Sequence, residues 1–292
     1  MANLKEIRVR IGSVQSTQKI TGAMKMVSAS KLRRAQNAIL GLRPYSNKLN
    51  ELLQQVSQNQ DNNEDIKLFE QRPIEKVILI VITSNKGLCG SFNSNIIKEA
   101  QRHIEEKYAT QASKNNVKLI CLGRKGKEQL SKKFEVIQCY ESLVDAPKFT
   151  DTTKIAQYLI EEYEAKNVDK IEIIYNRFIN PATQTIEIEN FLPVTNKTST
   201  TQETTLSNYL FEPSMQIILK ELMPKILKVQ FHKTVIDSVA SEHGARMTAM
   251  HKATDNANEI LKDLKLKYNN ARQAAITKEL IEIVGGAEAL NE

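Results

Sequence analysis

The sequence has no hydrophobic run long enough to cross a lipid bilayer. Its longest apolar stretch, Val77 to Ile82, is far shorter than the ~20 residues that a membrane-spanning helix needs. The first residues, MANLKEIRVR, also lack the apolar segment and cleavage site of a secretory signal. We therefore expect a soluble protein that works where it is made, and its 41% hydrophobic content is enough for a core of ordinary size.

Side chains that carry catalysis or bind metals are scarce. The three cysteines, Cys89, Cys121 and Cys139, are odd in number and widely spaced, which favours buried thiols in a reducing compartment over disulfides or a zinc site. The four histidines show no metal-ligand spacing, and SEHGARMTAMH does not match the HExxH pattern of zinc proteases. We expect no catalytic residue, no metal site and no cofactor on this chain.

Acidic residues are missing from one long stretch, since no Asp or Glu occurs between Glu6 and Glu51. Residues 1–57 carry a net charge of +8, whereas residues 58–213 sum to −2 and residues 214–292 to +1. The centre of the basic segment reads ITGAMKMVSASKLRRAQ. Such a helix could bind nucleic acid or an acidic protein surface, or it could be merely solvated. The aromatic side chains that stack on single-stranded nucleic acid are absent from residues 20–36.

Both ends of the chain show the repeat of a coiled coil. In residues 1–57 and again in residues 213–286, apolar or small residues recur at spacings of three and four. Pro44 is expected to bend the first helix without ending it, and Gly285 with Gly286 to end the second. Because neither helix can bury its stripe alone, we predict that the two pair antiparallel. The predicted seam comprises Leu4, Ile7, Ile11, Val14, Gln18, Thr21, Lys25, Ser28, Leu32, Ala35, Ile39, Leu42, Ser46, Leu49, Leu53 and Val56, and then Leu219, Leu222, Ile226, Val229, Ile236, Ala240, His243, Met247, Met250, Thr254, Ala257, Leu261, Leu264, Tyr268, Ala271 and Ala275.

The middle block, residues 75–195, alternates strand and helix patterns. Strands are expected at residues 75–83, 117–122, 134–138, 170–178 and 185–192, and helices near 95–108, after GRKG, and near 153–165. The last two strands look like a hairpin across NPATQ, and residues 196–212 read as a surface loop. The predicted fold class is α/β: a long antiparallel coiled coil of N- and C-terminal helices with a Rossmann-like α/β domain, mainly parallel in its sheet, inserted between them.

Two glycine turns follow predicted strands, where phosphate-binding loops also occur. GLCGSFN and GRKG match neither GxGxxG nor GxxxxGK followed by Ser or Thr. A structural turn is therefore favoured over nucleotide binding.

The predicted C-terminal helix extends beyond its partner. Its last segment, AAITKELIEIVGGAEAL, would project with its apolar side chains largely unpaired. Exposed apolar surface of this kind indicates a partner that encloses it. We expect an apolar collar made by other chains.

Three stretches together resemble the gamma subunit of F-type ATP synthase, of the bacterial type. They are IRVRIGSVQSTQKITGAMKMVSASKLRRAQ, the internal SNKGLCGSFN, and RMTAMHKATDNANEILKDLKLKYNNARQAAITKELIEIVGGA. The resemblance implies a central rotor shaft without an active site, which couples ion translocation to ATP synthesis in a ring of alpha and beta subunits. It also implies contacts with the epsilon subunit and the membrane ring of c subunits, and a peripheral place on the cytoplasmic side of the bacterial plasma membrane. In this family Asp is usual where Asn85 stands.

Carried over by position, the resemblance implies a set of residues at partner interfaces. They are Met24, Lys25 and Arg246 on the shaft facing beta subunits, Arg272 and Gln273 on the upper shaft, and Tyr209 and Glu212 near the foot on the c ring. From the charge pattern we also expect Lys31, Arg33 and Arg34 to contact surrounding subunits, and from the projecting apolar tip we expect the same of Ile276, Leu280 and Ile283. Two other functions compete with this interpretation. One is a free-standing basic coiled coil that binds nucleic acid, and the other is a nucleotide-dependent enzyme that uses the α/β domain.

Overall fold

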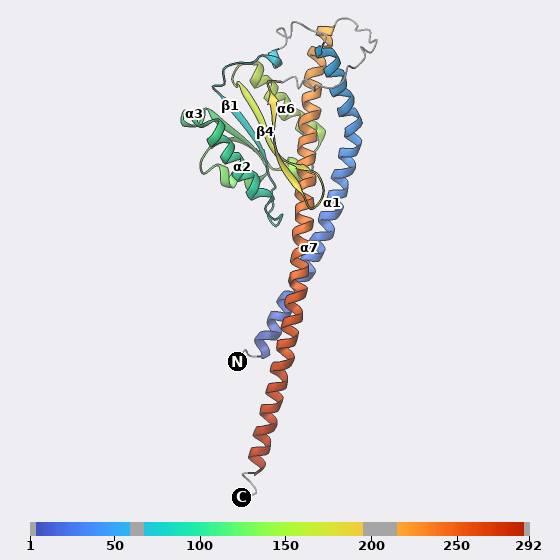
Figure 1. The fold of residues 1–292 in the computed structure, drawn as a ribbon, viewed down its shortest axis with the longest axis vertical. Helices are drawn as coiled ribbons and strands as arrows, with labels where there is room; N and C mark the ends of the chain where they lie inside the picture. Colours follow the sequence, from blue (N-terminus) through green and yellow to red (C-terminus); the bar gives the residue numbers. More distant parts are fainter. Residues whose placement is uncertain (1–3, 59–66, 195–214, 289–292) are drawn as a thin grey trace. The chain divides into compact units, whose positions relative to one another are not determined.

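The computed structural model describes residues 4–58, 67–194 and 215–288 (Figure 1). They form two compact units. The α/β unit is Ala29–Arg246, and the coiled-coil unit combines Met1–Ser28 with Met247–Glu292. Within the described residues, no helix is both long and apolar enough to cross a membrane. The loop predicted at residues 196–212 lies outside them.

The α/β unit contains a five-stranded sheet. Its strands are β1 (Val77–Ile82), β2 (Val117–Leu122), β3 (Glu135–Tyr140), β4 (Lys170–Phe178) and β5 (Gln184–Leu192). Their order across the sheet is β3-β2-β1-β4-β5; neighbours are parallel except for the antiparallel pair of β4 and β5. The five predicted strands, the mainly parallel pairing and the closing hairpin are confirmed.

Short helices connect the strands. They are η2 (Lys67–Phe69), α2 (Phe92–Lys107), α3 (Ala109–Ser113), α4 (Arg124–Leu130), α5 (Ser142–Asp145) and α6 (Phe149–Glu164). The sequence patterns predict α2, α4 and α6 but not η2, α3 or α5, which have five residues or fewer. Elements of this length carry too few turns for a periodic signal.

The strand β1 lies at the centre of the core, and all six of its residues are buried. Alternate side chains of a strand point to opposite faces. Val77, Leu79 and Val81 pack with α2 residues such as Ile96 and Ile104. The intervening isoleucines of β1 are buried on the other face, and Figure 1 draws α2 and α6 on opposite sides of the sheet. Burial on both faces explains why VILIVI is an unbroken apolar run.

The two long helices are α1 (Leu4–Gln58) and α7 (Met215–Glu288). The seam prediction is confirmed at every position whose side chain the structure describes, because each is buried or half-buried. In the α/β unit, Leu49 packs with Ile226 and Val229. In the coiled-coil unit, Thr21 Oγ1 and Thr254 Oγ1 are 2.8 Å apart. The helices run antiparallel in both units.

Neither Pro44 in α1 nor Gly285 with Gly286 in α7 ends its helix. As predicted, α1 continues through Pro44, and α7 also contains Pro224. The predicted stop at Gly285 and Gly286 is wrong, because α7 continues through both to Glu288. Glycine permits the left-handed turn that ends a helix but does not force it, and its cost inside a helix is only about 1 kcal/mol.

Within the α/β unit, α7 is buried on more than its seam. Phe231 packs against Phe191 of β5 with ring centroids 5.9 Å apart, and Ser241 Oγ donates to the Asn176 carbonyl of β4 at 2.8 Å. On α6, Thr152 Oγ1 lies 2.9 Å from His232 Nδ1. This part of α7 is therefore a core helix, which packs on the β4–β5 hairpin and α6 as well as on α1.

Candidate partner interface

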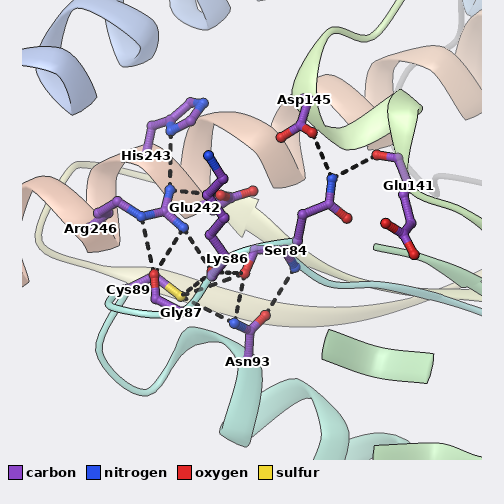
Figure 2. A network of polar contacts seen from close by, with 11 residues as sticks. Ser84, Lys86, Gly87, Cys89, Asn93, Glu141, Asp145, Glu242, His243 and Arg246 are labelled. Atoms are coloured by element: carbon purple, nitrogen blue, oxygen red, sulfur yellow. Dashed lines mark hydrogen bonds and ion pairs between the residues drawn. The ribbon is translucent and has the colours of Figure 1, made fainter. Parts of the chain in front are cut away.

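A polar network of the α/β unit lies where α7 passes the carboxyl end of β1. The β1–α2 loop, residues 83–91, turns there, and Arg246 of α7 reaches it (Figure 2). Arg246 Nη2 donates to the carbonyl oxygens of Lys86 at 3.0 Å and Gly87 at 3.3 Å. Only 8% of Arg246 is exposed. The guanidinium thus ties α7 to the loop.

The positive charge of Arg246 is matched on its own helix. Arg246 Nη1 donates to Glu242 Oε1 at 2.7 Å, and only 6% of Glu242 is exposed. Burial raises the pKa of Glu242, while the Arg246 charge opposes that shift. Burial, with the charges of Arg246 and Lys31, lowers the pKa of His243 to about 4. A neutral His243 beside the ion pair is therefore expected at pH 7.

The β1–α2 loop is held in shape from its other side by α2. Asn93 Oδ1 accepts from the Ser84 amide at 3.0 Å, and Asn93 Nδ2 donates to Ser84 Oγ at 2.7 Å and to Cys89 Sγ at 3.2 Å. Gly90 has a φ of +61°. Leu88, also left-handed at +62°, points outward with 64% of its surface exposed. The loop is thus fixed between α2 and α7.

Asn85 anchors the same loop to the segments that follow β2 and β3. Its Nδ2 donates to Asp145 Oδ2 at 2.9 Å and to the Glu141 carbonyl at 2.8 Å, and its Oδ1 accepts from the Arg124 amide at 3.0 Å. An aspartate here would have no N–H to donate and would face the Asp145 carboxylate. The amide therefore suits this position.

This loop lies at the place where doubly wound sheets bind ligands. From β1 the chain passes to β2 on one side of β1, and it later returns to place β4 on the other side. The strand order therefore reverses between β1 and β4, which is where the ligand crevice of such a sheet is expected. A phosphate-binding loop presents N–H groups. Here the carbonyls of Lys86 and Gly87 accept from Arg246. The arrangement binds a guanidinium, which supports the structural-turn interpretation of GLCGSFN.

The structure distributes the predicted interface residues between the two units. In the α/β unit, Lys31, Arg33 and Arg34 are exposed on α1, whereas Arg246 is buried against its own chain. The partner contact predicted for Arg246 stays a prediction. Tyr209 and Glu212 lie outside the described residues.

In the coiled-coil unit, the predicted residues near the end of α7 are exposed. Met24 and Lys25 of α1 are half-buried, and Arg272 and Gln273 are exposed. The exposed fraction is 49% for Ile276, 56% for Leu280 and 67% for Ile283. These values confirm that the apolar tip lacks an intramolecular partner over the described part of α7.

The exposed tip of α7 begins opposite the first turns of α1, where the pairing of the two helices stops. A groove of about 1140 Å³ lies between the first turns of α1 and the facing part of α7. Its lining includes Leu4 and Ile7 of α1 and Leu264, Ala271 and Ala275 of α7. Beyond this groove, α7 continues to Glu288, and its residues 279–287 are exposed.

Sequence reasoning missed the partners of Arg246. Glu242 and Arg246 stand four residues apart on one helix, which is a recognisable signal for an ion pair. The two loop carbonyls leave no such signal, because any residue supplies a backbone oxygen.

Comparisons with known proteins are consistent along the whole chain. The family model described as ATP synthase matches residues 3–290. The ATP synthase gamma chain of Cytophaga hutchinsonii is 50% identical over 294 residues, with 100% of each chain covered. That of Flavobacterium psychrophilum is 52% identical over 290 residues, with 99% of each covered.

Solved structures share the fold at lower identity. One chain of the Euglena gracilis mitochondrial ATP synthase, in an OSCP/F1/c-ring structure, has a TM-score of 0.66 at 19% identity. The match covers 98% of this chain and 94% of that one. A central stalk/c-ring structure of the Tetrahymena thermophila enzyme gives a TM-score of 0.59 at 24% identity, with 80% and 99% covered.

Proposed function

Because the chain belongs to the ATP synthase gamma chain family, we propose that it is the central-stalk rotor of an F-type ATP synthase. It couples ion translocation through the membrane sector to ATP synthesis and hydrolysis in a ring of alpha and beta subunits. The chain contributes no catalytic group. Each orientation of an asymmetric shaft favours one conformation of a neighbouring catalytic subunit, and rotation moves that preference around the ring.

The observation that carries this proposal is the apolar end of α7. Ile276, Leu280 and Ile283 are about half to two-thirds exposed, and such a stripe on a single helix is costly in water. Enclosure by an apolar collar of alpha and beta subunits removes that cost while it leaves the helix free to turn. Arg272 and Gln273, exposed just before the tip, would contact the collar as well.

The basic face of α1 supports the same partners. Lys31, Arg33 and Arg34 are exposed in a stretch without acids, and Met24 and Lys25 lie half-buried further toward the N-terminus. An acidic surface on the beta subunits would complement these charges and guide assembly.

The remaining partners are the epsilon subunit and the membrane c-ring, with Tyr209 and Glu212 at the foot. Through the c-ring the chain would lie peripherally on the cytoplasmic side of a bacterial plasma membrane. The Arg246 network has a role in this arrangement, because it fixes the β1–α2 loop to α7 within the α/β unit. Torque that enters the sheet of the α/β unit can pass to α7 only if the sheet and α7 move together.

The experiment replaces the tip and compares it with a matched control. Ile276, Leu280 and Ile283 changed together to Ser should reduce recovery of alpha and beta subunits with the tagged chain. The exposed polar control Lys278→Gln should leave recovery unchanged. Coupled ATP synthesis in membrane vesicles should fall in parallel with assembly. Normal assembly and normal coupled synthesis by the triple variant would refute the proposed enclosure.

The basic face has a separate test. Replacement of Lys31, Arg33 and Arg34 by Glu should weaken assembly or coupling and leave helical content unchanged, since exposed substitutions change stability by about 0.5 kcal/mol or less each. Replacement of the same three residues by Gln removes their attraction to an acidic partner without adding repulsion. A comparison of the Gln and Glu variants therefore separates the two effects. Unaltered coupled synthesis in the Glu variant would show that the face is merely solvated.

A further inference from the structure

Asp237 is a buried acid on α7 without a polar partner among the described residues. Only 9% of its surface is exposed, and the structure gives its carboxylate no hydrogen bond and no ion pair. It belongs to the part of α7 that packs on β4 and β5. An ionised carboxylate in such a place loses much of its hydration, and no described protein group replaces it.

Two donors of β4 bind Glu187 of β5 and not Asp237. Arg177 Nη1 of β4 donates to Glu187 Oε1 at 2.9 Å. The Tyr175 hydroxyl, also on β4, donates to Glu187 Oε2 at 3.1 Å. Glu187 therefore accepts from a guanidinium and a hydroxyl of β4, and neither group donates to Asp237.

The side chains that flank Asp237 on its own helix face a second hairpin acid. Gln230 Nε2 donates to Glu189 Oε1 at 2.7 Å, and Thr234 Oγ1 donates to Glu189 Oε2 at 3.4 Å. Two carboxylates of β5 thus accept these hydrogen bonds across the interface. Asp237 is the third acid, and it gains no hydrogen bond from either strand.

Charged groups from four elements surround Asp237. Lys233 of α7, Arg177 of β4 and Arg43 of α1 favour its ionised form, and Glu187 of β5 disfavours it. None of the three cations forms an ion pair with it at 4 Å or less within the described residues. Their attraction therefore acts over a longer distance, and desolvation dominates.

We propose that the Asp237 carboxyl is a proton-binding site that makes the packing of α7 on the β4–β5 hairpin respond to pH. Protonation removes the buried charge and supplies an O–H donor, so the packing tightens. Release of the proton returns a poorly solvated negative charge to the interface, and the packing loosens. The proton comes from solvent, and no other group changes its covalent state. This site depends on residues 29–246 alone and is independent of the rotor proposal.

The expected titration supports this assignment. Burial raises the pKa of Asp237 from 3.8 to about 6. A raised folded-state pKa means that the folded form holds the proton where the unfolded form has released it. The stabilisation by this proton is therefore lost as the pH rises through about 6. The complete effect is about 100-fold in the unfolding equilibrium constant, and the part between pH 5 and pH 7.5 is about tenfold.

The test compares the full chain with Asp237→Asn in urea at pH 5 and pH 7.5. The variant mimics the protonated side chain, so the ratio of its unfolding constant to that of the unsubstituted chain should change about tenfold between the two values. Asp263→Asn, at an exposed acid of the same helix, should show no such change. His232 and His243 titrate in all three proteins, and their contribution cancels in the ratio.

A second measurement needs no substitution. The carboxyl ¹³C signal of Asp237 in the full chain should titrate with a midpoint near pH 6, and amide hydrogen exchange in the hairpin turn, residues 179–183, should slow below it. A midpoint near pH 4, or a ratio for Asp237→Asn that is equal at both pH values, would overturn the proposal.

Discussion

Substitution of Arg246 by Met tests whether the ion pair in the α/β unit holds α7 to the β1–α2 loop. Met keeps most of the side-chain volume but removes the charge, so the buried Glu242 loses the one ion pair that it forms among the described residues. Removing one partner of a buried pair costs about 3–5 kcal/mol. The carbonyls of Lys86 and Gly87 also lose their donor. We expect the free energy of unfolding to fall by about 4 kcal/mol at pH 7.

The reasoning predicts a specific rescue. In the double variant Arg246→Met with Glu242→Gln, the stranded charge is gone, and the loss should shrink to about 1–2 kcal/mol, as expected for missing hydrogen bonds. The single variant should also lose less at pH 5 than at pH 7. Burial already raises the pKa of Glu242, so without Arg246 this group escapes its cost by taking up a proton. Stability is then lost as the pH rises.

Urea unfolding followed by circular dichroism measures these differences, with the exposed Arg33→Met as control, which should stay within about 0.5 kcal/mol. Hydrogen exchange of the loop amides, residues 84–91, should speed up in the single variant and not in the control. If Arg246→Met lost less than 1 kcal/mol, or if the double variant lost as much as the single one, the buried charge would not be the cause.

Two further predictions concern the sheet. Burial acts to raise the pKa of Glu172, but hydrogen bonds from His103 and Lys107 and the charge of Lys170 outweigh it and lower the value from 4.5 to about 2. Its contribution to the free energy of unfolding, at most about 3 kcal/mol, is present above pH 4.5 and lost as the pH falls toward 2. In acid unfolding, Glu172→Gln should lack this pH-dependent loss of stability. An acid unfolding curve equal to that of the unsubstituted chain would contradict the prediction. At Gly123, which has a φ of +102°, a Cβ would lie 2.2 Å from the Thr83 carbonyl oxygen. Gly123→Ala should therefore lower the free energy of unfolding in urea by at least about 2 kcal/mol. Gly87 has open space around it, so Gly87→Ala should lose less than half of that, and equal losses would show that the close approach is unimportant.

Local patterns predicted the elements of the fold because they reflect short-range periodicity. The seam of α1 is buried at Leu32, Ala35 and Ile39, as a heptad repeat requires. The boundaries of β2 and β4 agree with the expected strands to the residue. The thiols of Cys89 and Cys121 are buried, and that of Cys139 is partly buried.

The candidate site was harder to predict because its parts come from distant segments. Exposure of the tip follows from the unequal lengths of the two helices, so Ile276, Leu280 and Ile283 could be identified from the sequence. The environment of Arg246 could not, because it depends on which loop lies beside α7. Its two acceptors on the loop are backbone oxygens, which no residue type encodes.

By itself, the sequence determined the longer helices and the five strands, that the two long helices must pair, and that α7 has an unpaired apolar end. Each of these follows from the spacing of apolar residues along a few turns or one strand. Only the tertiary structure decided the second face of α7, the contact of Arg246 with the β1–α2 loop, and the burial of Asp237 beside two acids of β5. Those outcomes depend on strand order and on distances between residues far apart in the chain, and local periodicity carries no information about either.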